Sequence, residues 1–255
     1  PDQVRLAAEQ AAPDVVFHLG AYGVQRDERD TQQLITGNVG VTCALVEAVA
    51  ARARRFIHVG SVAEYAPAAS EALISEATPL CTTSTYGAAK AAAHLCGTAH
   101  AHARGLDFVT LRLFGVYGPG EADDRFIPGL VRRLMRGEAP RLTPGRQRRD
   151  WVYVDDAVAA LIAATSAPLS AGQAYNVCTG AGVEVADIAH AVAVALGTPD
   201  ADVGLGRIPY RPDEPMWQVG DPARFFAASS WRPSTSLADG VGRAVAWARE
   251  QEVHR

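Results

Sequence analysis

Residues 56–60 read FIHVG and residues 108–114 read FVTLRLF, and these two apolar stretches decide the fold. Between them, residues 84–104 form an alanine-rich pattern that is typical of a long helix. Residues 14–20 (DVVFHLG) and the helical pattern of residues 31–54 come before them in the same alternation. Strands that are apolar throughout are typical of parallel sheets, which are buried on both faces by the connecting helices. The sequence therefore predicts an α/β fold with a doubly wound parallel sheet.

The composition excludes several classes of protein. The chain has 255 residues and a net charge of −4, which argues against a general nucleic-acid binder. No apolar run approaches the roughly 20 residues of a membrane span, and no signal peptide is recognisable. The four cysteines form no CxxC pair, so we expect free thiols and no metal site; they are Cys43, Cys81, Cys96 and Cys178. We expect a cytoplasmic enzyme.

Lys90 is the only lysine in a chain whose lysines and arginines total 24. Arginine replaces lysine readily on a surface but does not reproduce a compact ammonium. Tyr86 lies four residues earlier, on the same face of the predicted helix. A neighbouring cation favours the phenolate and lowers the pKa of a tyrosine from about 10, so this pair is suited to proton transfer. The alternative interpretation is a surface helix with a stray lysine.

Ser61 follows the strand predicted at residues 56–60. In open parallel sheets, ligands bind beyond the carboxyl ends of the strands. A hydroxyl there can hydrogen-bond a substrate oxygen and share its proton with Tyr86. The alternative is an ordinary turn residue.

Together these motifs resemble the NAD(P)-dependent epimerase/dehydratase family, the extended short-chain dehydrogenases that act on nucleotide sugars. The stretch FIHVGSVAEY is similar to the family strand that carries a serine or threonine four residues before a tyrosine, here Ser61 and Tyr65. Tyr86 and Lys90 match the YxxxK motif of the family. The resemblance implies that Ser61, Tyr86 and Lys90 are the catalytic residues, and that Tyr86 and Lys90 also contact the cofactor.

Further family motifs imply the rest of the site. VVFHLGA (residues 15–21) resembles a strand whose following loop passes under the cofactor, and LRLFGVYGP (residues 111–119) resembles a strand and turn near the nicotinamide. RDWVYVDD (residues 149–156) and residues 211–214 resemble segments that contact the nucleotide diphosphate and the nucleotide. The implied cofactor residues are Leu19, Gly20, Ala21 and Phe114, and the implied substrate residues are Ser61, Arg149, Arg211 and Glu214.

The resemblance also implies a division of the chain. We expect residues 1–119 to form a partial dinucleotide-binding Rossmann domain to which residues 151–178 return. Residues 120–150 and 179–255 are expected to bind the nucleotide sugar. The glycine-rich turn of the family has no counterpart before Asp14, so we expect on the order of 60 residues of the family pattern to lie outside this sequence.

Two departures from the family pattern bear on the reaction. Family members that carry out 4,6-dehydration have an Asp-Glu pair after the strand serine or threonine, and this chain has Val62 and Ala63 there. Neither side chain can move a proton, which disfavours dehydration and also the decarboxylation branch. Gly115 stands where many epimerases have an asparagine near the diphosphate.

The leading hypothesis is a nucleotide-sugar C4 epimerase that works by transient hydride transfer to a nicotinamide cofactor, with NAD favoured over NADP. The first alternative is an NAD(P)H-dependent 4-keto-(6-deoxy)sugar-nucleotide reductase, because GSVAEY has some likeness to such enzymes. The second is a non-catalytic dinucleotide-binding relative. The expected ligand is a nucleotide-diphosphate sugar. We also expect a homodimer through the helices at residues 31–54 and 84–104, because relatives pair the corresponding helices.

Overall fold

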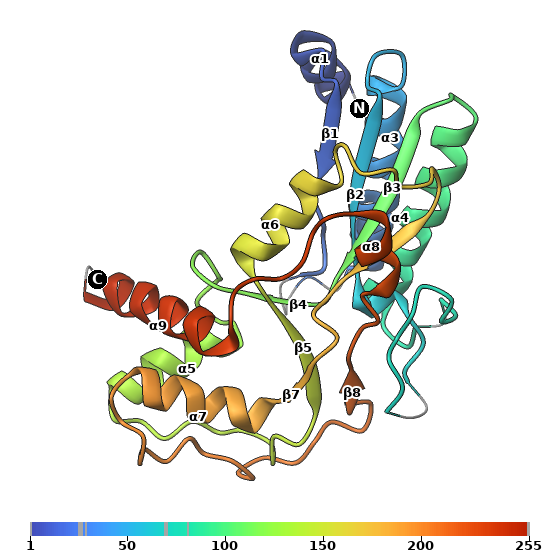
Figure 1. Cartoon of the computed structure of the whole chain (residues 1–255). Coiled ribbons are helices and arrows are strands. Elements are labelled where there is room, and N and C mark those ends of the chain that lie inside the picture. Colours follow the sequence, from blue (N-terminus) through green and yellow to red (C-terminus); the bar gives the residue numbers. More distant parts are fainter. Residues whose placement is uncertain (1, 25–27, 29, 69–70, 81, 254–255) are drawn as a thin grey trace.

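The computed structural model describes all residues except 1, 25–27, 29, 69–70, 81 and 254–255, so Cys81 lies outside the described residues. The described strands form two sheets (Figure 1). The first contains β1 (Val15–His18), β2 (Arg55–Ser61), β3 (Asp107–Leu113) and β6 (Ala174–Val177). The second contains β4 (Gly115–Tyr117), β5 (Arg148–Tyr153), β7 (Gly182–Glu184) and β8 (Trp217–Gln218).

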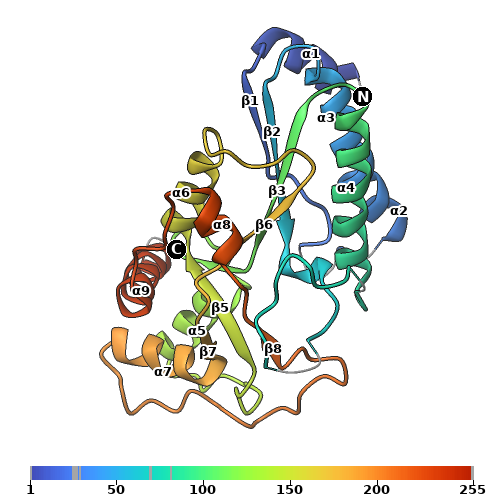
Figure 2. The same ribbon diagram turned by 45° about the vertical axis from the view of Figure 1, so that its right-hand side comes forward.

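The first sheet is parallel throughout, in the order β1-β2-β3-β6, as the apolar strands predict. Successive side chains point to opposite faces of a strand. Accordingly, Phe56 of β2 packs with the helices on one face, whereas Ile57 packs with those on the other. Helices α3 (Val41–Val49) and α4 (Thr85–His102) cover the first face, and α6 (Val154–Ala163) and α8 (Ala223–Ala228) cover the second (Figure 2).

The helix predicted at residues 31–54 is interrupted. It consists of α2 (Thr31–Leu34), a π-helical stretch η1 (Ile35–Gly40) and α3, and it ends at Val49. Asn38 lies within η1 and is buried. Its side-chain amide donates hydrogen bonds to the backbone oxygens of Leu34 and Tyr22, and its carbonyl accepts one from the Tyr22 backbone. The π-helical turn therefore fastens the loop that follows β1.

The second sheet packs against α5 (Phe126–Met135), α7 (Val185–Ala195) and α9 (Leu237–Val253). The remaining helical elements are α1 (Asp2–Ala11) and the 3-10 turn η2 (Val62–Glu64). Strand β5 pairs in parallel with β4 and β8 and antiparallel with β7. Among the described residues, no helix is long and apolar enough to cross a membrane.

Two buried aspartates of the RDWVYVDD stretch join distant parts of the chain. Asp150 accepts hydrogen bonds from the backbone of Thr179, Gly180 and Gly220. Asp156, in the first turn of α6, accepts them from the backbone of Ser234 and Thr235. Buried carboxylates are retained where such donors satisfy them, so both aspartates fix the loops that lead into the second sheet and α9.

Candidate active site

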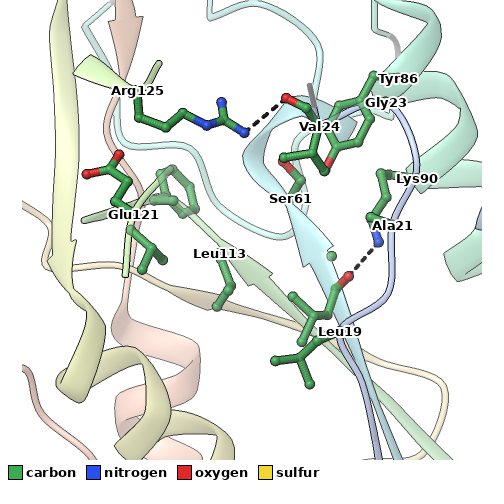
Figure 3. A pocket seen from close by; sticks show the side chains of 14 residues that line it. Leu19, Ala21, Gly23, Val24, Ser61, Tyr86, Lys90, Leu113, Glu121 and Arg125 are labelled. Atoms are coloured by element: carbon green, nitrogen blue, oxygen red, sulfur yellow. Dashed lines mark hydrogen bonds between the residues drawn. The ribbon is translucent and has the colours of Figure 1, made fainter. Parts of the chain in front are cut away.

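A cavity of about 530 Å³ lies at the carboxyl ends of β1, β2 and β3 (Figure 3). Several of the residues expected at the site line it together: Leu19, Ala21, Ser61, Tyr86, Lys90 and Phe114. The other lining residues come from the β1 loop, the ends of β2 and β3, and residues 116–125. The fold therefore gathers segments that are far apart in the sequence, from Leu19 to Arg125.

Ser61 is the last residue of β2 and the N-cap of the turn η2. Its side-chain oxygen accepts a hydrogen bond from the Ala63 backbone at 3.2 Å. The Ser61 hydroxyl lies close enough to the phenol of Tyr86 to act on its pKa, which it lowers. The structure thus places the serine and the tyrosine side by side at one wall of the cavity.

Helix α4 brings Tyr86 and Lys90 to this wall. Ser84 caps the helix, and its side chain accepts a hydrogen bond from the Gly87 backbone at 2.9 Å. A Cβ on Gly87 would overlap the Ala63 backbone oxygen, so glycine is required for the close approach of α4 to η2. This approach sets the tyrosine against the loop of Ser61.

The ionisation of Tyr86 differs from the sequence-based expectation. Burial raises the pKa of Tyr86, the neighbouring Ser61 hydroxyl opposes this, and the charge of Glu64 raises it further. The expectation that Lys90 lowers this pKa is wrong for this structure. The physical reason is the orientation of the ammonium: Lys90 is 2% exposed, and its Nζ donates a hydrogen bond to the Val59 backbone oxygen at 2.7 Å.

The cavity suits the nicotinamide end of a dinucleotide. Leu19 is 58% exposed beside the cavity, and with Ala21 and Phe114 it offers apolar walls to a flat ring. Gly20 is not among the lining residues and lies over His18, to which an added Cβ would approach within 3.3 Å. Asn38, which sequence reasoning missed, holds this loop through Tyr22. A polar residue between two glycines, in TGNVG, was the available signal.

Two charged residues of the cavity, Glu121 and Arg125, were also missed, because they belong to none of the motifs in the sequence. Arg125 donates a hydrogen bond across the cavity to the Val24 backbone oxygen at 2.9 Å. Glu121 has a buried Oε2 with no hydrogen-bond partner among the described residues. Burial raises the pKa of Glu121 to about 7, against the opposing charge of Arg125. Both lie across the cavity from Tyr86 and Lys90 (Figure 3).

A second cavity, of about 470 Å³, shares Phe114 with the first. It brings together the three remaining expected substrate residues, Arg149, Arg211 and Glu214. The carboxylate of Glu214 accepts a hydrogen bond from Arg149 Nη2 at 2.8 Å and from Arg211 Nη2 at 2.8 Å. Two guanidinium groups around one carboxylate leave a net positive charge, and guanidinium groups bind phosphates through paired N–H donors.

The residues that depart from the family pattern have structural roles. Val62 packs against an apolar cluster with Tyr65, Ile74 and Phe114. Gly115 lies in β4, where an added Cβ would come within 2.7 Å of the Asp150 backbone oxygen. The described residues contain no group of three or more His, Cys, Asp or Glu side chains that could hold a metal ion.

A parallel sheet with this cavity at its carboxyl edge, and a serine, a tyrosine and a lysine on one wall, defines a Rossmann-like protein of the short-chain dehydrogenase class. Residues 1–178 match the model of the NAD dependent epimerase/dehydratase family. The chain belongs to this family, and the sequence-based recognition and fold class are confirmed.

Similar proteins include both epimerases and dehydratases. A UDP-glucose 4-epimerase of Mycolicibacterium smegmatis is 31% identical over 249 residues, which cover 94% of this chain and 77% of that protein. A dTDP-glucose 4,6-dehydratase of Actinoplanes sp. is 28% identical over 251 residues, covering 97% and 77%. The structure of DesIV, a dTDP-glucose 4,6-dehydratase from Streptomyces venezuelae solved with NAD bound, matches with a TM-score of 0.87 at 25% identity, covering 98% and 79%.

Proposed function

We propose that this chain is a nucleotide-sugar C4 epimerase with NAD as its cofactor. The observation that carries the proposal is that Ser61, Tyr86 and Lys90 line one wall of the same cavity. When bound, NAD supplies a reversible hydride acceptor next to C4 of the sugar. Leu19, Ala21 and Phe114 would hold its nicotinamide end, and Arg149 and Arg211 would bind the diphosphate of the substrate.

The residues of the chain move the proton. The Tyr86 phenolate accepts the proton of the C4 hydroxyl, the electron pair of that O–H bond forms the C4 carbonyl, and the hydrogen on C4 leaves as hydride. Ser61 donates a hydrogen bond to the same oxygen. Rotation of the 4-keto sugar presents its other face, and Tyr86 then returns the proton as the hydride comes back. General acid–base catalysis of this kind contributes about 10²–10⁴ in rate.

Dehydratases are among the relatives, but two side chains disfavour 4,6-dehydration here. Elimination of water needs an acid and a base beside the sugar, and Val62 and Ala63 follow Ser61. Val62 is committed to an apolar cluster with Phe114. Epimerisation needs only one proton carrier, which is why it is the better match to this wall of the cavity.

The test is turnover of UDP-, dTDP- and GDP-hexoses with NAD, read by separating each sugar from its C4 epimer. We expect interconversion without accumulation of NADH, loss of activity in Tyr86→Phe, and retention in the control Tyr175→Phe. Tyr175 lies on β6, where its hydroxyl accepts a hydrogen bond from the Ser170 backbone. Stoichiometric oxidation of NAD(P)H by a 4-keto-6-deoxy sugar nucleotide would instead identify a ketoreductase. No turnover of any substrate would favour a non-catalytic relative.

A further inference from the structure

A buried carboxylate lies directly behind the proton-transfer site. Glu64 is 0% exposed at the end of the turn η2. Its Oε1 accepts a hydrogen bond from the Ser61 backbone at 2.8 Å, and its Oε2 accepts one from Arg112 Nε at 2.7 Å. An added Cβ on Gly60 would collide with Glu64 Oε1, so the carboxylate lies close against the backbone at the end of β2. Glu64 therefore fixes the backbone that carries the Ser61 hydroxyl.

Arg112 holds Glu64 from the other side and is itself 2% exposed on β3. Its Nη1 donates a hydrogen bond to the Tyr65 hydroxyl at 3.0 Å, and that hydroxyl donates one to Asn176 Oδ1 at 2.6 Å. Asn176 in turn donates from its backbone to Glu76 at 2.7 Å. A chain of buried and partly buried hydrogen bonds thus runs from Ser61 across β3 to β6. Such networks restrict the side chains they include.

The same carboxylate acts on Lys90. The ammonium is bonded to Val59 and Glu64 is bonded to Ser61, so the two groups hold positions two residues apart on β2. A buried ammonium tends to lose its proton unless an opposite charge lies near it. Burial lowers the pKa of Lys90, and the charge of Glu64 raises it. No other charged group is resolved as acting on this pKa among the described residues.

We propose that Glu64 is the positioning carboxylate of the proton-transfer site, which orients Ser61 and lies next to the ammonium of Lys90 along β2. This inference rests on the proposed function for its meaning in turnover, but its central claim concerns two side chains of this protein and can be measured without substrate. It also explains the presence of a buried acid here, since Glu64 pairs with the buried Arg112, accepts a hydrogen bond from the Ser61 backbone and raises the pKa of Lys90.

The single lysine makes a direct test possible. With ¹⁵N-lysine labelling, one side-chain signal reports the titration of Lys90 in the folded chain. We expect Glu64→Gln to lower the pKa of Lys90 by about one unit or more, the usual effect of losing a nearby opposite charge. The matched control is Glu76→Gln, because Glu76 occupies the far end of the same network. This control should leave the Lys90 titration unchanged.

The activity readout is the pH profile of turnover. The pKa of Tyr86 is affected by Ser61, Glu64 and Arg125. The charge of Lys90 lowers the pKa of His18 and of His58. The charge of Glu64 raises the pKa of both Tyr86 and Lys90. Its removal therefore lowers both, and the whole profile of Glu64→Gln should move to lower pH. A purely structural role would lower kcat without moving the profile.

An unchanged Lys90 titration in folded Glu64→Gln would overturn the proposal. Removing one member of a buried ion pair can prevent folding, so the double variant Glu64→Gln/Arg112→Met, which removes both charges, provides a second test with the same expected direction. If the Lys90 titration shifts while no nucleotide sugar turns over, the positioning role stands and the proposed function fails. If a nucleotide sugar turns over and the Lys90 titration does not shift, the proposed function stands and the positioning role of Glu64 fails.

Discussion

The Nζ atom of Lys90 donates a hydrogen bond to the backbone oxygen of Val59 at 2.7 Å, which ties the middle of α4 to the end of β2. A flexible lysine side chain is held by this bond at the edge where three parallel strands end. The ammonium is thereby placed on the cavity wall, while Tyr86, one turn earlier on the same helix, lies beside Ser61 on that wall. The position of Lys90 is thus set by the strand and not by the tyrosine.

The first prediction concerns this lysine. Tyr86→Phe should cost about 10²–10⁴ in turnover, the range for a lost general acid–base. Lys90→Arg should also be severely impaired, because a guanidinium is longer and planar and cannot occupy the position of the ammonium under Val59. Higher pH should not restore Tyr86→Phe, because this variant has no phenol to ionise. The measurement is kcat between pH 6 and 10. Parental activity in Lys90→Arg would contradict the mechanism.

The second prediction concerns the arginine pair around Glu214. Arg149→Ala should weaken binding of a nucleoside diphosphate by roughly 1.5–3 kcal/mol, the scale of hydrogen bonds to charged groups. The matched control is Arg148→Ala, since Arg148 is the neighbouring residue and pairs instead with Glu184 on β7. Calorimetric titration with UDP, dTDP and GDP measures the binding free energy of each nucleoside diphosphate to both variants. Equal weakening by the two substitutions would remove the assignment of Arg149.

The third prediction concerns three buried histidines between the first sheet and α3 and α4. Burial lowers the pKa of His18 to about 4 and of His94 to about 4, and it lowers the pKa of His58 well below its usual range. The unfolded chain binds protons near pH 6.5, whereas the folded chain binds them only at lower pH. Stability is therefore lost as the pH falls from about 6.5 towards 4, by roughly 2 kcal/mol for each such histidine at pH 5.

His58 provides the test of this prediction, and His102 provides the control. Neither of its ring nitrogens has a hydrogen-bond partner among the described residues, and its ring stacks on Phe108 with centroids 5.8 Å apart. His58→Phe should therefore raise the free energy of unfolding, and more at pH 5 than at pH 7.5. His102→Phe, at an exposed position, should not change the pH dependence. Urea unfolding at the two pH values measures these free energies of unfolding. An equal increase for His58→Phe at both pH values would refute the charge-based explanation.

The central strands were predictable because a strand that is buried on both faces has an apolar sequence throughout. Residues 56–60 and 108–114 were expected, and the strands span Arg55–Ser61 and Asp107–Leu113. The second sheet was not predictable from local pattern. Its strands β4, β7 and β8 contain two or three residues each, and they exist because partners from distant segments pair with β5. Short strands of this kind carry no periodicity that a sequence can display.

The residues of the candidate site also fall into those that the sequence predicts and those that it does not. Ser61, Tyr86 and Lys90 belong to motifs with fixed spacing, and the structure gathers them at one cavity wall. Glu64 and Asn38 belong to no such spacing. A single glutamate after a strand is indistinguishable from a surface charge until β3 supplies Arg112, 48 residues later, as its partner. Polar residues that act through tertiary partners could therefore not be found from the sequence.

The last prediction concerns assembly. Helix α4 leaves Ala88, Leu95 and Ala99 exposed, and Leu95 is 57% exposed. Ile35, in the π-helical stretch that contacts α4, is 49% exposed. These apolar side chains exceed what one buried helix face requires, so we predict a homodimer through α3 and α4 with an interface above about 1,000 Å².

Leu95→Arg places a charge in the centre of this face and should convert the dimer into a monomer at micromolar concentration, as measured by sedimentation. Val194→Arg is the matched control, because Val194 is an equally exposed apolar residue, 62% exposed, on α7 beside the second sheet. It should leave the dimer intact. Burying a charge without a partner is costly, which is why a single arginine suffices to separate the two copies if the face is the interface. A parental protein that sediments as a monomer, or a Leu95→Arg variant that remains a dimer, would exclude assembly through these helices.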